Sequence, residues 1–226
     1  DEEQAEAIAD AFSSISQQYE PIKREEIEFP PFSPSSVPEV SYEKVTDYLK
    51  HMKVNKSTAP GDIPAKVLRD NAQFLCVPIR DILNEAIKSG QWPQIYKMET
   101  VTPAPKEYPP ETCEKLRPIA GLFNIDQIME KIVAEMVIDD MKEKLDPGQF
   151  GNQKHLGIQH YLVRLLHRIL SSVDNNKNGE IRAVLCLFID WKQAFSRQCH
   201  TLGVESFKKN GVRPSLLPLL ISYLEG

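Results

Sequence analysis

The chain has 226 residues, and its 26% charged and 41% hydrophobic side chains are typical of a globular protein and exclude a wholly disordered one. No apolar run reaches the roughly 18 residues needed to cross a membrane, and the acidic start lacks the apolar stretch of a signal peptide. Four widely spaced cysteines without a CxxC pair predict reduced thiols in an intracellular protein and no zinc site. The net charge of −5 is uneven, because residues 1–50 hold 12 acidic and 4 basic side chains and the remainder is mildly basic. A mildly basic body gives only weak support for a polyanionic partner.

The N-terminal part of the sequence predicts an acidic leader. Residues 3–19 form a helical pattern with one apolar stripe. The stripe consists of Ile8, Phe12, Ile15 and Tyr19. Residues 21–40 contain five prolines, a density that disfavours a helix and favours an extended linker. We therefore expect residues 1–40 to be a leader helix and linker attached to a separate body.

The first part of the body predicts helices separated by turns. Ser41 is suited to cap the first helix, and Pro60-Gly61 marks a tight turn before a short helix over residues 63–70. A longer helix follows and is ended by Gly90. Its predicted apolar stripe is Phe74, Leu75, Ile79, Leu83 and Ile87.

The middle of the chain predicts a hairpin and a long helix. Residues 98–105 and 116–121 have the pattern of two short strands, where proline is tolerated at an edge. Asn124 is expected to cap a long helix, with Gln127 completing a capping-box pattern, and the helix is expected to end at residues 146–148. Further helices are predicted over residues 158–173, 202–210 and 214–223. The predicted fold class is helix-rich α+β.

A continuous apolar run at residues 183–190 predicts a strand buried on both faces, and the run ends in Asp190. A carboxylate at the end of such a strand is suited to hold a metal ion at a site that handles phosphates. An aspartate in this place can equally cap the strand end or the following turn. The strand pattern alone favours this second, structural role.

Five segments follow one another in a characteristic order: APGDIPAKVL, VTPAPK, LRPIAGL, QFGNQK and IDWKQAF. Their order and spacing over residues 41–226 closely resemble the reverse transcriptase of LINE-like (non-LTR) retrotransposons. The phrases GNQK, IQHYL, DWKQAF and GVRPSL resemble one branch of such elements from animals. The resemblance implies a right-hand polymerase, with fingers at residues 41–180 and the beginning of an incomplete palm at 181–226.

The resemblance also implies a catalytic site. Asp190 matches the first metal-binding aspartate of the palm, and the backbone carbonyl of Trp191 would be a further ligand of one Mg²⁺ ion. Two such ions lower the charge repulsion during nucleotidyl transfer. Phe195 matches the aromatic steric gate that selects deoxynucleotides.

Other matched residues would contact the substrates. Lys106 and Arg117 match basic residues of the fingers hairpin that pair with the incoming triphosphate, and the guanidinium can bind it in a forked geometry. Gln153 would belong to the nucleotide pocket. The residues expected to touch the template are Pro60, Gly61, Gln149 and Lys154.

The sequence departs from the family pattern in three ways. Ser196 stands where the family commonly has Asp, and His155 stands where Gly is common after the Lys. A histidine does not adopt a glycine-only backbone easily, so an altered loop is expected there. The later family motifs, including the aromatic-x-Asp-Asp turn with two more metal carboxylates, are absent from the chain. Asp190 alone is therefore expected to hold Mg²⁺ poorly, and its strand is expected to have an unpaired edge that aggregates unless covered.

Two functional hypotheses follow. The first is a fragment of an RNA-directed DNA polymerase that is inactive in isolation. Its intact parent would act in the nucleus on an RNA template, a DNA primer and deoxynucleotides, and a protein partner would cover the unfinished palm. The second is a host-retained, non-catalytic relative that binds RNA or a protein partner, motivated by Ser196 and His155.

Overall fold

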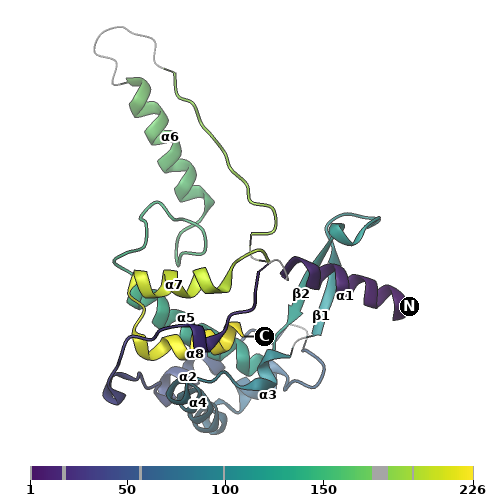
Figure 1. The fold of residues 1–226 in the computed structure, drawn as a ribbon, viewed down its shortest axis with the longest axis vertical. Coiled ribbons are helices and arrows are strands. Elements are labelled where there is room, and N and C mark those ends of the chain that lie inside the picture. Colours follow the sequence, from purple (N-terminus) through teal and green to yellow (C-terminus); the bar gives the residue numbers. More distant parts are fainter. Residues whose placement is uncertain are drawn as a thin grey trace. The chain divides into compact units, whose positions relative to one another are not determined.

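The computed structural model of the chain describes residues 2–16, 19–55, 58–98, 100–174, 183–194 and 196–225. The chain divides into two compact units: Asp1–Met141 with Phe195–Gly226, here called the core unit, and Lys142–Ala194, here called the extended unit. The core unit contains α1 (Glu2–Ser16), α2 (Tyr42–Lys50), α3 (Ala65–Asp70), α4 (Ala72–Ser89), β1 (Thr100–Pro105), β2 (Leu116–Gly121), α5 (Asn124–Met141), α7 (His200–Asn210) and α8 (Leu217–Leu224) (Figure 1). Five 3₁₀ helices complete it: η1 (Arg24–Glu26), η2 (Pro34–Ser36), η3 (Gln94–Lys97), η4 (Cys113–Lys115) and η5 (Pro214–Leu216). The extended unit contains α6 (Ile158–Asp174).

This composition confirms the predicted α+β class, because a small antiparallel sheet of β1 and β2 accompanies many helices. None of the helices in the described ranges is long and apolar enough to cross a membrane.

Local sequence signals fix the ends of several helices. The Ser41 hydroxyl accepts a hydrogen bond from the Lys44 backbone N–H at 3.3 Å, so Ser41 caps α2 as predicted. Gly90 ends α4 with φ of 66°, a left-handed conformation that glycine adopts without steric cost. The long helix α5 runs from Asn124 to Met141 and does not reach residues 146–148. The predicted capping box is wrong, because the Asn124 amide donates to Asp62 Oδ2 and the Gln127 side chain donates to the Leu122 carbonyl.

The core unit is held together by one large apolar cluster. Leu49 of α2, Leu68 of α3 and Leu83 of α4 are fully buried. α5 and α8 contribute to the same cluster. Burying such a side chain contributes about 1.5–3 kcal/mol. The predicted stripe of α4 is right at positions 79, 83 and 87, but Phe74 is 80% exposed, and Cys76 takes its place in the core.

The leader segment between α1 and α2 packs onto this core and is more than a tether. Ile22, Ile27 and Val40 are buried. The Arg24 Nη1 group donates to the Gly90 carbonyl at 3.1 Å, which ties η1 to the end of α4. The proline-rich stretch is mostly extended, as predicted, and is interrupted by η1 and η2.

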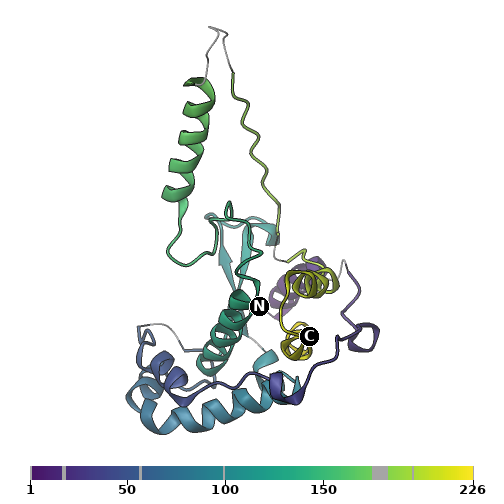
Figure 2. The same cartoon turned by 90° about the vertical axis from the view of Figure 1, so that its left-hand side faces the viewer.

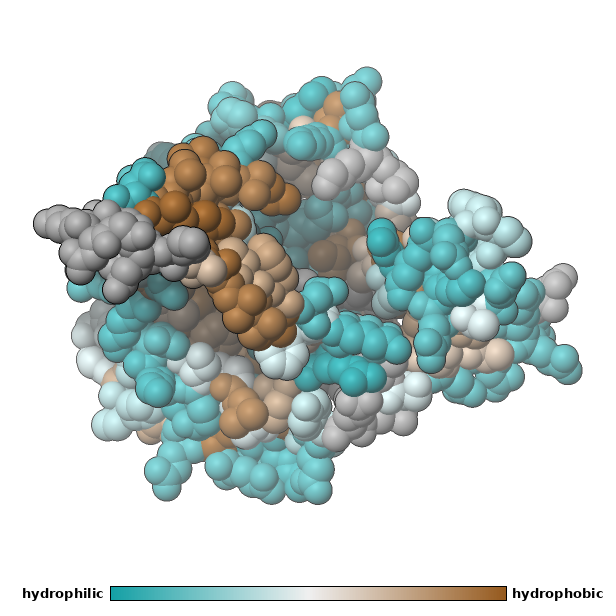
Figure 3. Space-filling view, turned by 90° about the horizontal axis from the view of Figure 1, so that it is seen from above, coloured by the Kyte–Doolittle hydropathy of each residue, from teal (hydrophilic) through white to brown (hydrophobic). Residues whose placement is uncertain are grey.

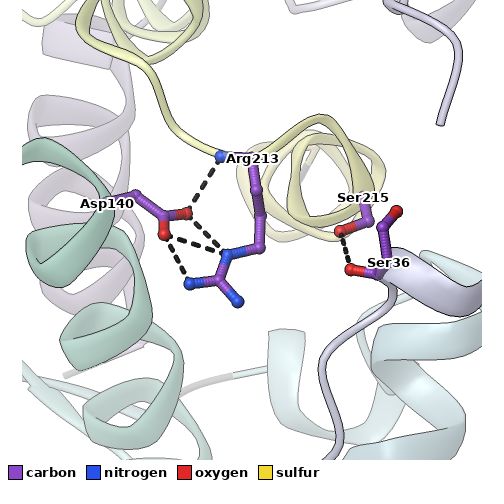
Figure 4. A network of polar contacts seen from close by, with 4 residues as sticks. All are labelled: Ser36, Asp140, Arg213 and Ser215. Atoms are coloured by element: carbon purple, nitrogen blue, oxygen red, sulfur yellow. Dashed lines mark hydrogen bonds and ion pairs between the residues drawn. The ribbon is translucent and has the colours of Figure 1, made fainter.

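A polar contact joins the two chain segments of the core unit, between Asp140 of α5 and Arg213 just before η5 (Figure 4). Arg213 Nε donates to Asp140 Oδ2 at 2.8 Å and to Oδ1 at 3.0 Å, and its Nη2 donates to Oδ1. The Arg213 backbone N–H also donates to Asp140 Oδ2, at 2.9 Å. Nearby, the Ser215 hydroxyl donates to the Ser36 carbonyl at 3.1 Å. The C-terminal helices are thereby fixed to α5 and to the leader.

The described residues of the extended unit form no comparable core. The helix α6 forms as predicted, but it has no buried residue, and an extended segment follows it (Figure 2). Large hydrophobic side chains of both are exposed. Figure 3 shows hydrophobic residues, in brown, gathered at the surface.

The predicted buried strand at residues 183–190 is wrong for this structure. The segment has no strand assignment, and Leu185, Leu187 and Phe188 are 97%, 82% and 74% exposed. Among the residues that the structure describes, only β1 and β2 pair with each other. A strand needs a hydrogen-bonded neighbour, and this segment has none among them.

Candidate nucleic-acid interface

A polar groove lies between the Pro60-Gly61 turn and the β-hairpin of the core unit. Its volume is about 460 Å³. It is lined by Thr58, Ala59, Pro60, Thr100, Thr102, Ala120, Gly121, Leu122 and Gln127. Three threonine hydroxyls and one amide therefore offer hydrogen-bond donors and acceptors without a fixed charge. Such groups, together with nearby cations, are typical contacts to a nucleic-acid backbone.

Asp62 fixes the turn beside the first residue of α5. Its Oδ2 accepts from the backbone N–H of Asn124 at 2.9 Å and from Asn124 Nδ2 at 2.7 Å. Asn124 Nδ2 also donates to the Ile63 carbonyl at 2.9 Å. The carboxylate thus satisfies a free N–H at the positive end of the helix. Gly61, with φ of 80°, provides the left-handed residue that the turn needs.

The register of the hairpin determines which side chains border the groove. Thr102 pairs with Ile119, and Ala104 pairs with Arg117. Directly opposed residues of an antiparallel pair point to the same face, and alternate residues along one strand do so too. Arg117 therefore lies on the same face of the hairpin as Thr100 and Thr102, which line the groove. This placement puts Arg117, the residue predicted to pair with the triphosphate, on the hairpin face that borders the groove beside Pro60.

Lys106 continues from β1 and is held by the opposite arm of the hairpin. Its backbone N–H donates to the Lys115 carbonyl at 2.8 Å, and its Nζ donates to the Glu114 carbonyl at 2.5 Å. Lys115 is engaged in ion pairs with Glu107 at 2.5 Å and Glu111 at 3.3 Å. Lys106 itself bonds to a neutral carbonyl, so it can exchange this contact for a phosphate at small cost.

Tyr108, at the tip of the hairpin, is a candidate that the sequence patterns did not single out. Its ring is 86% exposed and lies two residues after Lys106. Exposed aromatic rings near cations are platforms on which bases stack. An aromatic residue inside a polar, proline-containing loop is the signal that could have indicated it.

Tyr96 of η3 lies near the carboxylates of Asp126 and Asp62. Burial raises its pKa above the ordinary value, and the neighbouring carboxylates Asp126 and Asp62 raise it further. Its phenol therefore stays protonated at neutral pH. The ring packs against Phe123, with the two centroids 6.0 Å apart.

The loop that carries Gln149, Gln153 and Lys154 belongs to the extended unit and is folded against α6. Arg164 Nη1 donates to the Pro147 carbonyl at 2.6 Å, and the guanidinium lies 5.6 Å from the centre of the Phe150 ring. Gln153 is half-buried, while Gln149 and Lys154 are exposed. The structure thus places these three residues on one ordered loop.

His155 in the same loop has φ of 64°. This is the left-handed region in which glycine is favoured, and a side chain there costs about 1–2 kcal/mol. The position therefore has the backbone conformation expected for the family's glycine, and histidine adopts it under strain.

The residues predicted to bind metal are not assembled into a metal site. Asp190 is exposed and lies in the extended segment, and the Trp191 ring is 76% exposed. In the described ranges, no group of three or more His, Cys, Asp or Glu side chains could hold an ion. Mg²⁺ needs several oxygen ligands, so the described residues do not fit it. Phe195, the predicted steric gate, lies outside the described residues.

Comparison with known proteins gives one informative similarity. The chain is 27% identical, over 195 residues and 82% of its length, to a "Probable RNA-directed DNA polymerase from transposon BS" of Drosophila melanogaster. The match covers 20% of that protein, so the chain spans about a fifth of the length of the curated relative it matches. No family model matches the chain.

This similarity identifies the class of protein that the chain resembles, a transposon reverse transcriptase. It confirms the resemblance that the order of the sequence motifs indicated.

Proposed function

We propose that residues 41–180 are the fingers region of an RNA-directed DNA polymerase of a LINE-like element and that residues 181–226 begin its palm. The Pro60-Gly61 turn and the hairpin face contact the template, while Arg117 and Lys106 pair with the triphosphate of the deoxynucleotide. The groove that joins the turn to the hairpin is the observation that carries this proposal. It lies between Pro60, which the family resemblance had marked, and the hairpin face that carries Arg117.

The rest of the active centre belongs to the palm. Segment 183–190 would become a strand if the longer polymerase supplied neighbouring strands, and Asp190 and the Trp191 carbonyl would then be two of the several oxygen ligands that Mg²⁺ needs. Apolar side chains of this segment and of α6 are exposed, which supports the proposal that another part of the polymerase covers them. Gln149, Gln153, Lys154 and Phe195 complete the nucleotide and template contacts in that assembly, which acts in the nucleus.

The chain by itself is therefore inactive in primer extension. A primer–template with deoxynucleotides and Mg²⁺ is expected to show no synthesis above the background without protein. Template-dependent extension by this chain alone would overturn the assignment of the missing ligands to the longer protein.

Binding to an RNA–DNA duplex tests the fingers assignment. Fluorescence anisotropy at several salt concentrations measures the dissociation constant and its salt slope. Arg117→Ala is expected to weaken binding about three- to tenfold and to reduce the magnitude of the salt slope by about 1, because one phosphate contact is lost. Lys106→Ala is expected to have a similar but smaller effect.

The matched control is Arg80→Ala, which removes the same charge from α4, where Arg80 pairs with Asp81 at 2.5 Å. It should leave duplex binding unchanged. Equal losses in Arg117→Ala and Arg80→Ala would show that only net charge matters. Binding of a protein but of no nucleic acid would favour the non-catalytic alternative instead.

A further inference from the structure

The hairpin has a second, apolar face that is turned away from the groove. Val101 and Pro103 alternate with Thr100 and Thr102 along β1, so they lie on the opposite side of the strand. Helix α1 lies near the hairpin (Figures 1 and 2). A cleft between them is lined by Val101 and Pro103 of β1 and, on the side of α1, by Gln4, Ala5, Ile8, Ala9 and Phe12.

The contact between α1 and β1 is partly open. Ile8 and Phe12 are half-buried, and a mostly apolar cleft of about 310 Å³ remains between the helix and the strand. Helix α1 also contacts η4, on the loop between the two strands. The helix therefore contacts the hairpin at its connection and faces β1 across the cleft.

A two-stranded hairpin is only marginally stable in water by itself. The groove face of this hairpin carries polar residues and Arg117, which leaves the opposite face as the place for apolar stabilisation. Among the described elements, α1 borders that face across the cleft, and Val101 on the strand keeps 45% of its surface exposed.

The leader keeps α1 close to the hairpin. Ile22 and Ile27 are buried in the core unit, and Arg24 is bonded to the Gly90 carbonyl, only a few residues after α1 ends. Docking of α1 is thus intramolecular, with a high effective concentration at the hairpin. A helix with two half-buried anchors can then remain docked despite its small contact.

We propose that α1 is a brace for the hairpin, and that Ile8 and Phe12 are positioning residues for Arg117. The functional part of this inference rests on the proposed function of the hairpin. Helix α1 contains four acidic residues and no lysine or arginine; the acidic residues are Glu2, Glu3, Glu6 and Asp10. Their negative charge repels a polyanion from the side of the hairpin on which α1 lies. The nucleic acid is therefore directed to the groove face.

Hydrogen–deuterium exchange of the full chain tests the brace directly. Phe12→Asp is expected to raise amide exchange in β1 and β2 about tenfold, because a half-buried apolar contact is replaced by a charge. Exchange in α2 and α4 should not change. Phe12→Leu should restore near-normal exchange, since it keeps an apolar anchor.

An isomeric pair of variants provides the control. Ala9 lines the cleft, whereas Ala7 lies about 200° around the helix from it. Ala9→Asp and Ala7→Asp have the same composition and charge. The brace predicts faster hairpin exchange in Ala9→Asp only, and equal exchange in the two variants would overturn it.

Measurements of duplex binding test whether α1 positions Arg117 for its contact or only stabilises the hairpin. Phe12→Asp should weaken binding about as much as Arg117→Ala, and the double variant should bind no more weakly than either single variant, because both remove the same contact. Additive losses would contradict a positioning role. If the wild-type chain binds no duplex, the proposed function fails, while the exchange experiment still decides whether α1 braces the hairpin.

Discussion

The core unit and the extended unit contain equally clear amphipathic helices, yet only the core unit buries them. Leu83 on α4 has no exposed surface, whereas Leu166, on the apolar stripe of α6, is 56% exposed. Both helices form from the same kind of periodic pattern. The pattern therefore determines that a helix forms, and a partner surface determines whether its stripe contributes to stability. The core unit has such surfaces within itself, which is why it can position a groove.

The largest expected effect is the difference in stability between a variant that removes a leucine from α4 and one that removes a leucine from α6. Leu83→Ala is expected to lower the free energy of unfolding by about 3 kcal/mol, because it leaves a cavity in the core. Leu166→Ala should change it by less than about 0.5 kcal/mol, as for an exposed position. Urea unfolding followed by circular dichroism measures both. Similar losses in the two variants would mean that α6 is packed in solution.

Gly61 and Gly90, two of the glycines with a left-handed backbone, differ in how closely neighbouring atoms approach them. A Cβ atom at Gly90 would lie 2.6 Å from Pro218 Cβ, while one at Gly61 would meet nothing within 4 Å. Gly90→Ala is therefore expected to cost about 3 kcal/mol, from overpacking and backbone strain together. Gly61→Ala should cost only about 1 kcal/mol, from strain alone. Equal unfolding midpoints for the two variants would show that α8 does not pack on the end of α4.

Asp140→Asn tests the polar contact between α5 and the C-terminal helices. The expected loss is about 2 kcal/mol, because Asp140 is nearly buried but Arg213 is 38% exposed and partly screened. Burial acts to raise the pKa of Asp140, but hydrogen bonds and charge from Arg213 outweigh it, so the pKa lies below its usual value.

The sign of the pH dependence follows from that lowered pKa. The stabilisation by Asp140 is present above the carboxyl's ordinary pKa of 3.8 and is lost as the pH falls through the lower, folded-state value. The difference in unfolding free energy between wild type and Asp140→Asn should therefore shrink below about pH 4. A difference that stays constant down to pH 2 would exclude this contact as its source.

His155→Gly should give the smallest effect and concerns the extended unit. Glycine removes the strain of the left-handed residue, a gain of at most about 1 kcal/mol after its own entropy cost. The gain is local to the loop, so native-state trypsin cleavage after Lys154 is expected to slow by a few fold. Faster cleavage would indicate that the imidazole itself stabilises the loop.

Sequence patterns predicted the features that depend on neighbouring residues. The cap at Ser41, the end of α4 at Gly90 and the hairpin of β1 and β2 all follow from local chemistry. Those that depend on distant residues were missed, including the bond from Asn124 to Asp62 and the packing of α1 on β1. The buried strand at 183–190 was wrong for the same reason, because its apolar side chains predict burial but not the strand that would provide it.

The groove was partly predictable. Pro60, Gly61 and Arg117 were marked by the family resemblance, and the structure brings the turn and the hairpin face together. The resemblance did not identify Thr58 or Thr102 as site residues, since a single threonine in a loop or strand is not a distinctive sequence signal. Only the folded arrangement of the turn and the hairpin brings their hydroxyl groups together.

Protection of amides by an RNA–DNA duplex tests the central claim most directly. Hydrogen exchange of the full chain, with and without the duplex, should show slower exchange at residues 58–62 and throughout β1 and β2. Helices α2 and α4, which form the opposite part of the core unit, should be unaffected. Protection confined to α2, α4 or α6, or no protection at a concentration that saturates binding, would contradict the proposed interface.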